Sequence, residues 1–288
     1  MRAKAEIASM LIFVFASLLA IFLALVMVQS EPSLKSKSPT YGIGYILIYI
    51  LVAIIFSIIM IYLGKKKKLG IFKFIYAFIV SYVIFYVVLI LASIFIYNIY
   101  AIFAISIGVA ILYFYLLIFR NEWYITDSAG FFLVVGISSI WGFTFGVWAA
   151  VIFLAVFAVY DYIAVYKTKH MVSLARIAVD EEMPMLFVIP ENSGFKMKNV
   201  TFENRGEGNV LMLGFGDIAL PSILVVSSAL FDVSHIVFFT IFPLAGALAG
   251  MVVLYFTNVN RPAPGLPYIN TGAIAGFILA FIIFKMLL

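Results

Sequence analysis

The chain has 288 residues, of which 66% are apolar, 17% aromatic and 11% charged, and its mean hydropathy is +1.21. Soluble domains are about 45–50% apolar and about 25% charged, so this composition excludes a water-soluble fold and indicates a polytopic membrane protein. The net charge of +5 comes from basic residues scattered between apolar runs, which is typical of membrane proteins and not of nucleic-acid binders. The absence of cysteine excludes disulfides, thiolate metal sites and cysteine nucleophiles.

Apolar runs long enough to cross the hydrocarbon as a helix, about 20 residues, follow one another along the chain. Five of them predict single spans: Ile7–Val28, Tyr41–Gly64, Val210–Leu230, His235–Thr257 and Tyr268–Leu288. Two longer runs, Ile71–Phe119 and Ser128–Tyr166, exceed one crossing, and we divide them near Tyr97–Asn98 and Gly142–Gly146. The sequence therefore predicts an all-α polytopic membrane protein with nine transmembrane helices.

The distribution of basic residues predicts the orientation of these spans. If the N-terminus is cytoplasmic, 15 of the 18 lysines and arginines lie on the cytoplasmic side: Arg2, Lys4, Lys65, Lys66, Lys67, Lys68, Lys73, Arg120, Lys167, Lys169, Arg176, Lys196, Lys198, Arg205 and Arg261. Only Lys35, Lys37 and Lys285 lie outside. This positive-inside bias predicts a cell-membrane protein with a cytoplasmic N-terminus and an extracellular C-terminus.

The chain divides into three regions that together form one membrane domain. Residues 1–166 hold spans one to six, residues 167–209 form a polar and partly mobile cytoplasmic loop, and residues 210–288 hold spans seven to nine. Within the loop, "MLFVIP" predicts a short strand and "SLARIAV" a short amphipathic helix. We interpret "GKKKKLG" as a topology anchor, with binding to anionic lipid or to a partner as the alternative.

Two of the thirteen acidic residues, Asp161 and Asp217, lie inside predicted spans, where an ionised carboxylate costs several kcal/mol. Asp161 is about six residues before the cytoplasmic end of span six near Lys167. Asp217 is about seven residues after the cytoplasmic start of span seven at Val210. Both depths are roughly 10 Å. If these antiparallel helices are neighbours and the acids face each other, they form a carboxylate dyad.

Two carboxylates close together share a proton, and such a pair performs aspartic peptidase chemistry with an activated water and no cofactor. The same two acids suit a proton- or cation-coupled transporter or a cation leak channel, which is the alternative from another class. A zinc peptidase is disfavoured because the chain has two histidines and no HExxH motif. A rhomboid-type serine protease is disfavoured because no nucleophile motif surrounds Ser138, Ser139 or His235.

Three local motifs resemble those of the presenilin and signal peptide peptidase family. They are Tyr160-Asp161, Gly214-Phe215-Gly216-Asp217 and Pro264-Gly265-Leu266-Pro267, which correspond in order to the YD, GxGD and PAL motifs. Together with the nine predicted spans, they identify the chain as similar to an archaeal-type presenilin homologue. The resemblance implies a presenilin-like fold and an intramembrane aspartyl protease of the GxGD type, with Asp161 and Asp217 catalytic and the other motif residues at the substrate.

The third motif departs from the family pattern, because Gly265 replaces the usual alanine. The overlapping Pro262-Ala263-Pro264 is a second candidate, but Pro264–Pro267 keeps the Pro-x-Leu-Pro spacing. The resemblance implies transmembrane peptide or protein substrates within the lipid, and it does not imply an obligate partner subunit. A cytoplasmic N-terminus is presenilin-like, whereas "GDIALP" is closer to signal peptide peptidases, and we give the orientation more weight.

Overall fold

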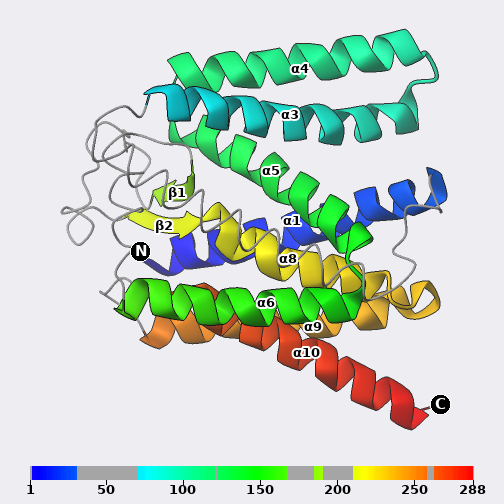
Figure 1. Cartoon of the computed structure of the whole chain (residues 1–288), viewed down its shortest axis with the longest axis vertical. Coiled ribbons are helices and arrows are strands. Elements are labelled where there is room, and N and C mark those ends of the chain that lie inside the picture. The colour runs from blue at the N-terminus through cyan, green and yellow to red at the C-terminus, as the bar shows by residue number, and fades with distance from the viewer. Residues whose placement is uncertain are drawn as a thin grey trace. The chain divides into compact units, whose positions relative to one another are not determined.

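The computed structural model describes residues 2–30, 70–120, 122–167, 185–190, 210–257 and 263–287. The predicted second span, Tyr41–Gly64, lies outside these ranges, as do most of the 167–209 loop and Pro262. The elements run in the order α1 Arg2–Ser30, α3 Gly70–Phe95, α4 Ile99–Phe119, α5 Trp123–Thr144, α6 Val147–Tyr162 with a π-helical turn Ile163–Lys167, β1 Leu186–Pro190, β2 Val210–Gly214, α8 Phe215–Ala229, a 3₁₀ turn Val233–His235, α9 Ile236–Thr257 and α10 Leu266–Leu287 (Figure 1).

Helices long and apolar enough to span a membrane dominate the described part of the chain. Seven meet that requirement, and α8 is a shorter apolar helix. Both predicted divisions of the long runs are confirmed: α3 ends at Phe95 and α4 begins at Ile99, while α5 ends at Thr144 and α6 begins at Val147. Asn98 marks the first division as an N-cap, because its side chain accepts hydrogen bonds from the N–H groups of Tyr100 and Ala101. The total of nine spans stays a prediction.

The predicted helical start of span seven at Val210 is wrong. Residues 210–214 form β2, which pairs antiparallel with β1 from Leu186↔Gly214 to Pro190↔Val210. The strand predicted within "MLFVIP" is confirmed as β1. An apolar run of five residues satisfies either pattern, and here a partner strand meets the backbone hydrogen bonds that a helix would otherwise supply. As a result, α8 begins at Phe215 and Asp217 lies in its first turn.

The described residues form two compact units. The first comprises the start of α1, then α3, α4, α5 as far as Gly136, both strands and Phe215. The second comprises the rest of α1, α5 from Ile137, then α6, α8 from Gly216, α9 and α10. In the first unit α3 and α4, which follow each other in sequence, pack side by side (Figure 1). In the second unit α10 packs against both α9 and α6.

Glycines bring α9 and α10 into backbone contact. The two helices carry matching GxxxG sequences, Gly246–Gly250 ("GALAG") and Gly272–Gly276 ("GAIAG"). A Cβ added at Gly246 would fall on the carbonyl oxygen of Gly272, and one added at Gly272 would fall on that of Gly246. A Cβ at Gly250 would likewise fall on the carbonyl oxygen of Tyr268. Such close approach is how small residues stabilise helix pairs in membranes, and here it fixes the start of α10.

Candidate active site

Asp161 lies near the end of α6 and is buried, with 4% of its surface exposed. Its Oδ2 atom accepts a hydrogen bond of 3.2 Å from the backbone N–H of Leu266. Leu266 is the first residue of α10, and the carbonyl of Gly265 accepts the first hydrogen bond of that helix, from the N–H of Ile269. The first N–H groups of a helix have no partner within it, so the Asp161 carboxylate satisfies one of them. Directly after Asp161, α6 widens into its π-helical turn, a feature that is frequent at functional sites.

Asp217 lies in the first turn of α8 and is half-buried. A Cβ added at Gly265 would stand 2.9 Å from both Cγ and Oδ1 of Asp217, which is closer than real Cβ atoms approach. A side chain at position 265 would therefore crowd the Asp217 carboxyl group and require it to shift. Gly265 is the residue that replaces the usual alanine of the family pattern. In the structure it makes room for Asp217.

The third motif joins the two aspartates. Asp161 contacts the N–H of Leu266, and Asp217 contacts the neighbouring Gly265. Because these residues are bonded to each other, backbone geometry keeps the two carboxyl groups within about 10 Å. The sequence places the aspartates 56 positions apart, and the 264–267 segment lies a further 47 positions on. The structure thus brings the three predicted motifs to one place.

The remaining motif residues differ in what they contact. Gly216 is exposed, and a Cβ added there would meet nothing within 4 Å, so open space lies next to Asp217. Gly214 is the last residue of β2 and pairs with Leu186. The ring of Phe215 is buried against that of Phe187, with 4.6 Å between their centroids. The half-buried ring of Tyr160 packs edge-on against Phe157, with 6.2 Å between centroids.

The two prolines of the third motif play different parts. Pro264 is buried in irregular backbone before α10. The predicted start of span nine at Tyr268 leaves Pro267 before the helix, and this is wrong, because α10 begins at Leu266 and Pro267 lies within its first turn. Proline is tolerated there because N–H groups of a first helical turn have no helical partner to lose.

Sequence reasoning missed Asn270, one turn after Leu266. It is fully buried in α10, and its Nδ2 donates a 3.0 Å hydrogen bond to the carbonyl of Leu154 in α6. Among the described atoms its Oδ1 has no hydrogen-bond partner. The signal was present in the sequence, since an amide in an apolar helix must find a polar partner or stay unpaired at a cost.

Hydrogen bonds from serines also fix α8 near Asp217. Ser138 of α5 donates to the carbonyl of Ala219 at 3.1 Å, and Ser17 of α1 lies 2.8 Å from Ser222, between their hydroxyl oxygens. Pro221 lies four residues after Asp217 and cannot donate to its carbonyl, which loosens the helix at that point. Hence α8 is held by its neighbours more than by its own first turn.

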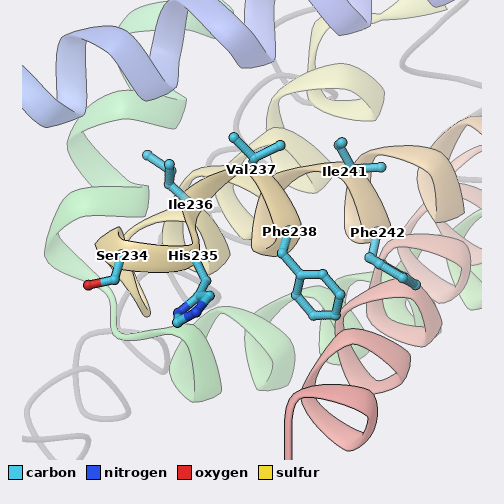
Figure 2. Close-up of a pocket in the computed structure, with 7 residues that line it drawn as sticks. All are labelled: Ser234, His235, Ile236, Val237, Phe238, Ile241 and Phe242. Carbon is cyan, nitrogen blue, oxygen red and sulfur yellow. The ribbon is translucent and has the colours of Figure 1, made fainter. Parts of the chain in front are cut away.

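A hollow of about 410 Å³ lies on the surface of α9 and the 3₁₀ turn before it (Figure 2). Its lining is mostly apolar and ends at Ser234 and His235. No aspartate lines it, and its lining residues come from α9 and the 3₁₀ turn before it. Such a surface is typical of a helix that faces lipid, so we do not assign the catalytic chemistry to this hollow.

Seven of the described helices are long and apolar enough to cross a membrane, and Asp161 and Asp217 both contact the segment at Gly265 and Leu266. These features define a polytopic membrane protein with a candidate carboxylate site. Comparison with known proteins identifies the family. The profile described as "Signal-peptide peptidase, presenilin aspartyl protease" matches residues 10–286, and the chain belongs to this family. The predicted resemblance is therefore confirmed.

Two solved structures are similar to this chain over nearly its whole length. A presenilin family intramembrane aspartate protease in the C222 space group has a TM-score of 0.67 and 27% identity, covering 96% of this chain and 99% of that one. Such a protease in the P2 space group has a TM-score of 0.64 and 28% identity, covering 95% and 96%. A comparison with curated proteins gave no match. Family and structures indicate an intramembrane aspartyl protease and give no support to a transporter.

Proposed function

We propose that Asp161 and Asp217 form the catalytic dyad of this protease and hydrolyse peptide bonds within transmembrane segments of single-span proteins. The observation that carries the proposal is that both carboxyl groups contact adjacent residues of one segment, Gly265 and Leu266. Two acids so placed share a proton, since ionising both in a medium of low dielectric is unfavourable. The reaction as proposed needs water and no cofactor or metal.

The hydrolysis divides the work between the two acids. The ionised carboxylate takes a proton from water while the water oxygen bonds to the scissile carbonyl carbon. The protonated acid donates its hydrogen bond to the carbonyl oxygen and stabilises the charge that develops there. The carbon–nitrogen bond then breaks, and the leaving amine takes a proton from the dyad. The products are one carboxyl and one amino terminus, and the dyad returns to its starting state.

The surroundings of the two aspartates support an entry side next to Asp217. Asp161 is buried and its orientation is fixed by the N–H of Leu266, whereas Asp217 is half-exposed beside the open space at Gly216. A substrate helix hides its peptide bonds, so it must unwind before water can attack. The space beside Gly216 would admit an extended backbone, because no side chain of the described residues fills it.

The charge distribution supports a cytoplasmic N-terminus and cytoplasmic 167–209 loop in the cell membrane. With that orientation the presenilin-like arrangement favours substrates whose own N-terminus lies outside. The chain as proposed acts on membrane-embedded peptides, and its sequence does not imply an obligate partner subunit.

The test uses the purified protein in lipid vesicles with single-span model substrates in both orientations. We expect the wild type to cleave them, and Asp161→Asn or Asp217→Asn to lower kcat by at least about a thousandfold, since each removes one member of a unit. Asp232→Asn is the matched control, because Asp232 follows the C-terminal end of α8, whereas Asp217 lies in the first turn of that helix. Cation conduction by a wild type that cleaves no substrate would refute the peptidase proposal and favour the transporter.

A further inference from the structure

The ring of Phe215, the variable residue of the GxGD motif, is held inside the first unit. The side chain is 6% exposed, and the ring of Phe187 in β1 lies edge-on to it at 4.6 Å between centroids. On α5, a Cβ added at Gly130 would fall on the Cε1 and Cζ atoms of the Phe215 ring. Gly130 and Phe187 thus form a seat for this ring, which we call the Phe215 seat. A ring so enclosed contacts protein and presents almost no surface to a substrate.

A hydrogen bond between β1 and α5 connects the two elements that form the Phe215 seat. Asp127 lies one turn before Gly130 on α5, and its Oδ1 accepts a 2.8 Å hydrogen bond from the N–H of Val188. Val188 follows Phe187 directly, so α5 binds the strand beside the residue whose ring lies against Phe215. The backbone N–H of Phe215 donates to the carbonyl of Met185 at 3.3 Å, which continues the strand pairing to the start of α8.

Phe215 is also the first residue of α8, and Asp217 lies two residues later in the same turn. Packed interiors do not deform smoothly, so a displaced ring shifts the backbone that carries it. We propose that Gly130 and Asp127 are positioning residues, which set the start of α8 through Phe215 and thereby aim Asp217. The inference rests on the proposed function of Asp217. It assigns Phe215, at the variable position of the GxGD motif, a packing role against α5.

The first experiment changes the seat and measures kcat and KM separately in lipid. Gly130→Ala should displace the ring and lower kcat on the order of ten- to a hundredfold, because small misplacements of reacting groups have effects of this size. KM should change less than about threefold, because the ring does not reach the substrate. Gly136→Ala is the matched control on the same helix, since its Cβ would fall on Val83 of α3 instead. It should keep kcat within about twofold of the wild type.

A compensating change tests whether the Phe215 ring is the cause. Phe215→Leu removes the ring atoms that an alanine at position 130 would meet, so the double variant should cleave faster than Gly130→Ala alone. Coupling of this kind is expected for residues in contact and absent for independent ones. Additive effects of the two substitutions, or equal losses of kcat in Gly130→Ala and Gly136→Ala, would overturn the inference.

The contact with Val188 gives a second, separate test. Asp127→Ala removes the acceptor and should lower kcat about tenfold, whereas Asp127→Asn keeps an acceptor oxygen and should retain most of the activity. Hydrogen exchange supplies a readout that needs no catalysis. Amides of residues 210–217 should exchange faster in Gly130→Ala and Asp127→Ala and be unchanged in Gly136→Ala. Unaltered exchange in both α5 variants would refute the positioning role. If exchange is altered in these variants but the wild-type protein itself cleaves no substrate, the proposed function is refuted and the positioning of α8 is not.

Discussion

Replacing Asn270 by leucine should separate activity from stability. The substitution removes the 3.0 Å hydrogen bond to Leu154, which contributes about 0.5–1.5 kcal/mol. It also removes a fully buried Oδ1 atom that has no partner among the described atoms, and such a group costs about 1–3 kcal/mol. The Leu154 carbonyl lies within α6 and keeps its helical hydrogen bond. The free energy of unfolding should therefore stay within about 1 kcal/mol of the wild type or rise by up to about 2 kcal/mol.

Activity should move the other way. Asn270 ties α10 to α6 one turn after Leu266, whose N–H holds Asp161, so its loss loosens the segment between the two aspartates. We expect kcat to fall on the order of tenfold or more. Thermal unfolding in lipid gives the stability, and cleavage of a single-span peptide gives kcat. Thr271→Val is the control, because the exposed Thr271 hydroxyl donates to the carbonyl of Pro267 in its own helix and, among the described residues, does not tie α10 to α6. An unchanged kcat, or a loss of more than about 2 kcal/mol of stability, would refute this reasoning.

Three further changes test neighbouring contacts. Gly265→Ala should lower kcat about tenfold with little loss of stability, because its Cβ would displace the Asp217 carboxyl; wild-type rates would contradict the contact. Gly272→Val should destabilise the protein by about 1–3 kcal/mol in thermal unfolding, because it separates α9 from α10, whereas Gly108→Ala, with nothing within 4 Å, should not. The hydrogen bond from His235 lowers the pKa of Asp232, so this contact stabilises the fold above the usual carboxyl pKa and loses that contribution as the pH falls through the lowered value. Thermal unfolding of wild type and Asp232→Asn should therefore converge in acid.

Local patterns in the sequence were enough to predict the divisions of the two long apolar runs and the motifs that carry the family resemblance. The divisions near Asn98 and Gly146 follow from the length of a membrane crossing, and the three motifs follow from residue order. The start of α8 could not be predicted in this way, because β2 exists through its pairing with β1 across residues 191–209. When β1 is not considered, the residues "VLMLG" look like the first part of the apolar run that continues into α8. The contact between Asp217 and Gly265 also joins residues far apart in sequence, so local patterns could not predict it.

All three motifs of the candidate site stand at helix ends, and this bears on the cost of placing carboxylates there. Asp161 precedes the end of α6 and accepts from the first N–H of α10, while Asp217 lies in the first turn of α8. A helix N-terminus stabilises a nearby carboxylate by about 0.3–1 kcal/mol, and up to about 2 kcal/mol when partly buried. An ionised aspartate at membrane depth costs about 3 kcal/mol on insertion scales. The helix N-terminus next to each aspartate therefore offsets only part of the free-energy cost of ionising that aspartate in the membrane. Ionising both aspartates at once stays unfavourable. In the proposed dyad the two acids would share a single proton and so avoid the second charge, and the arrangement proposed for catalysis would then also let both acids remain in the membrane.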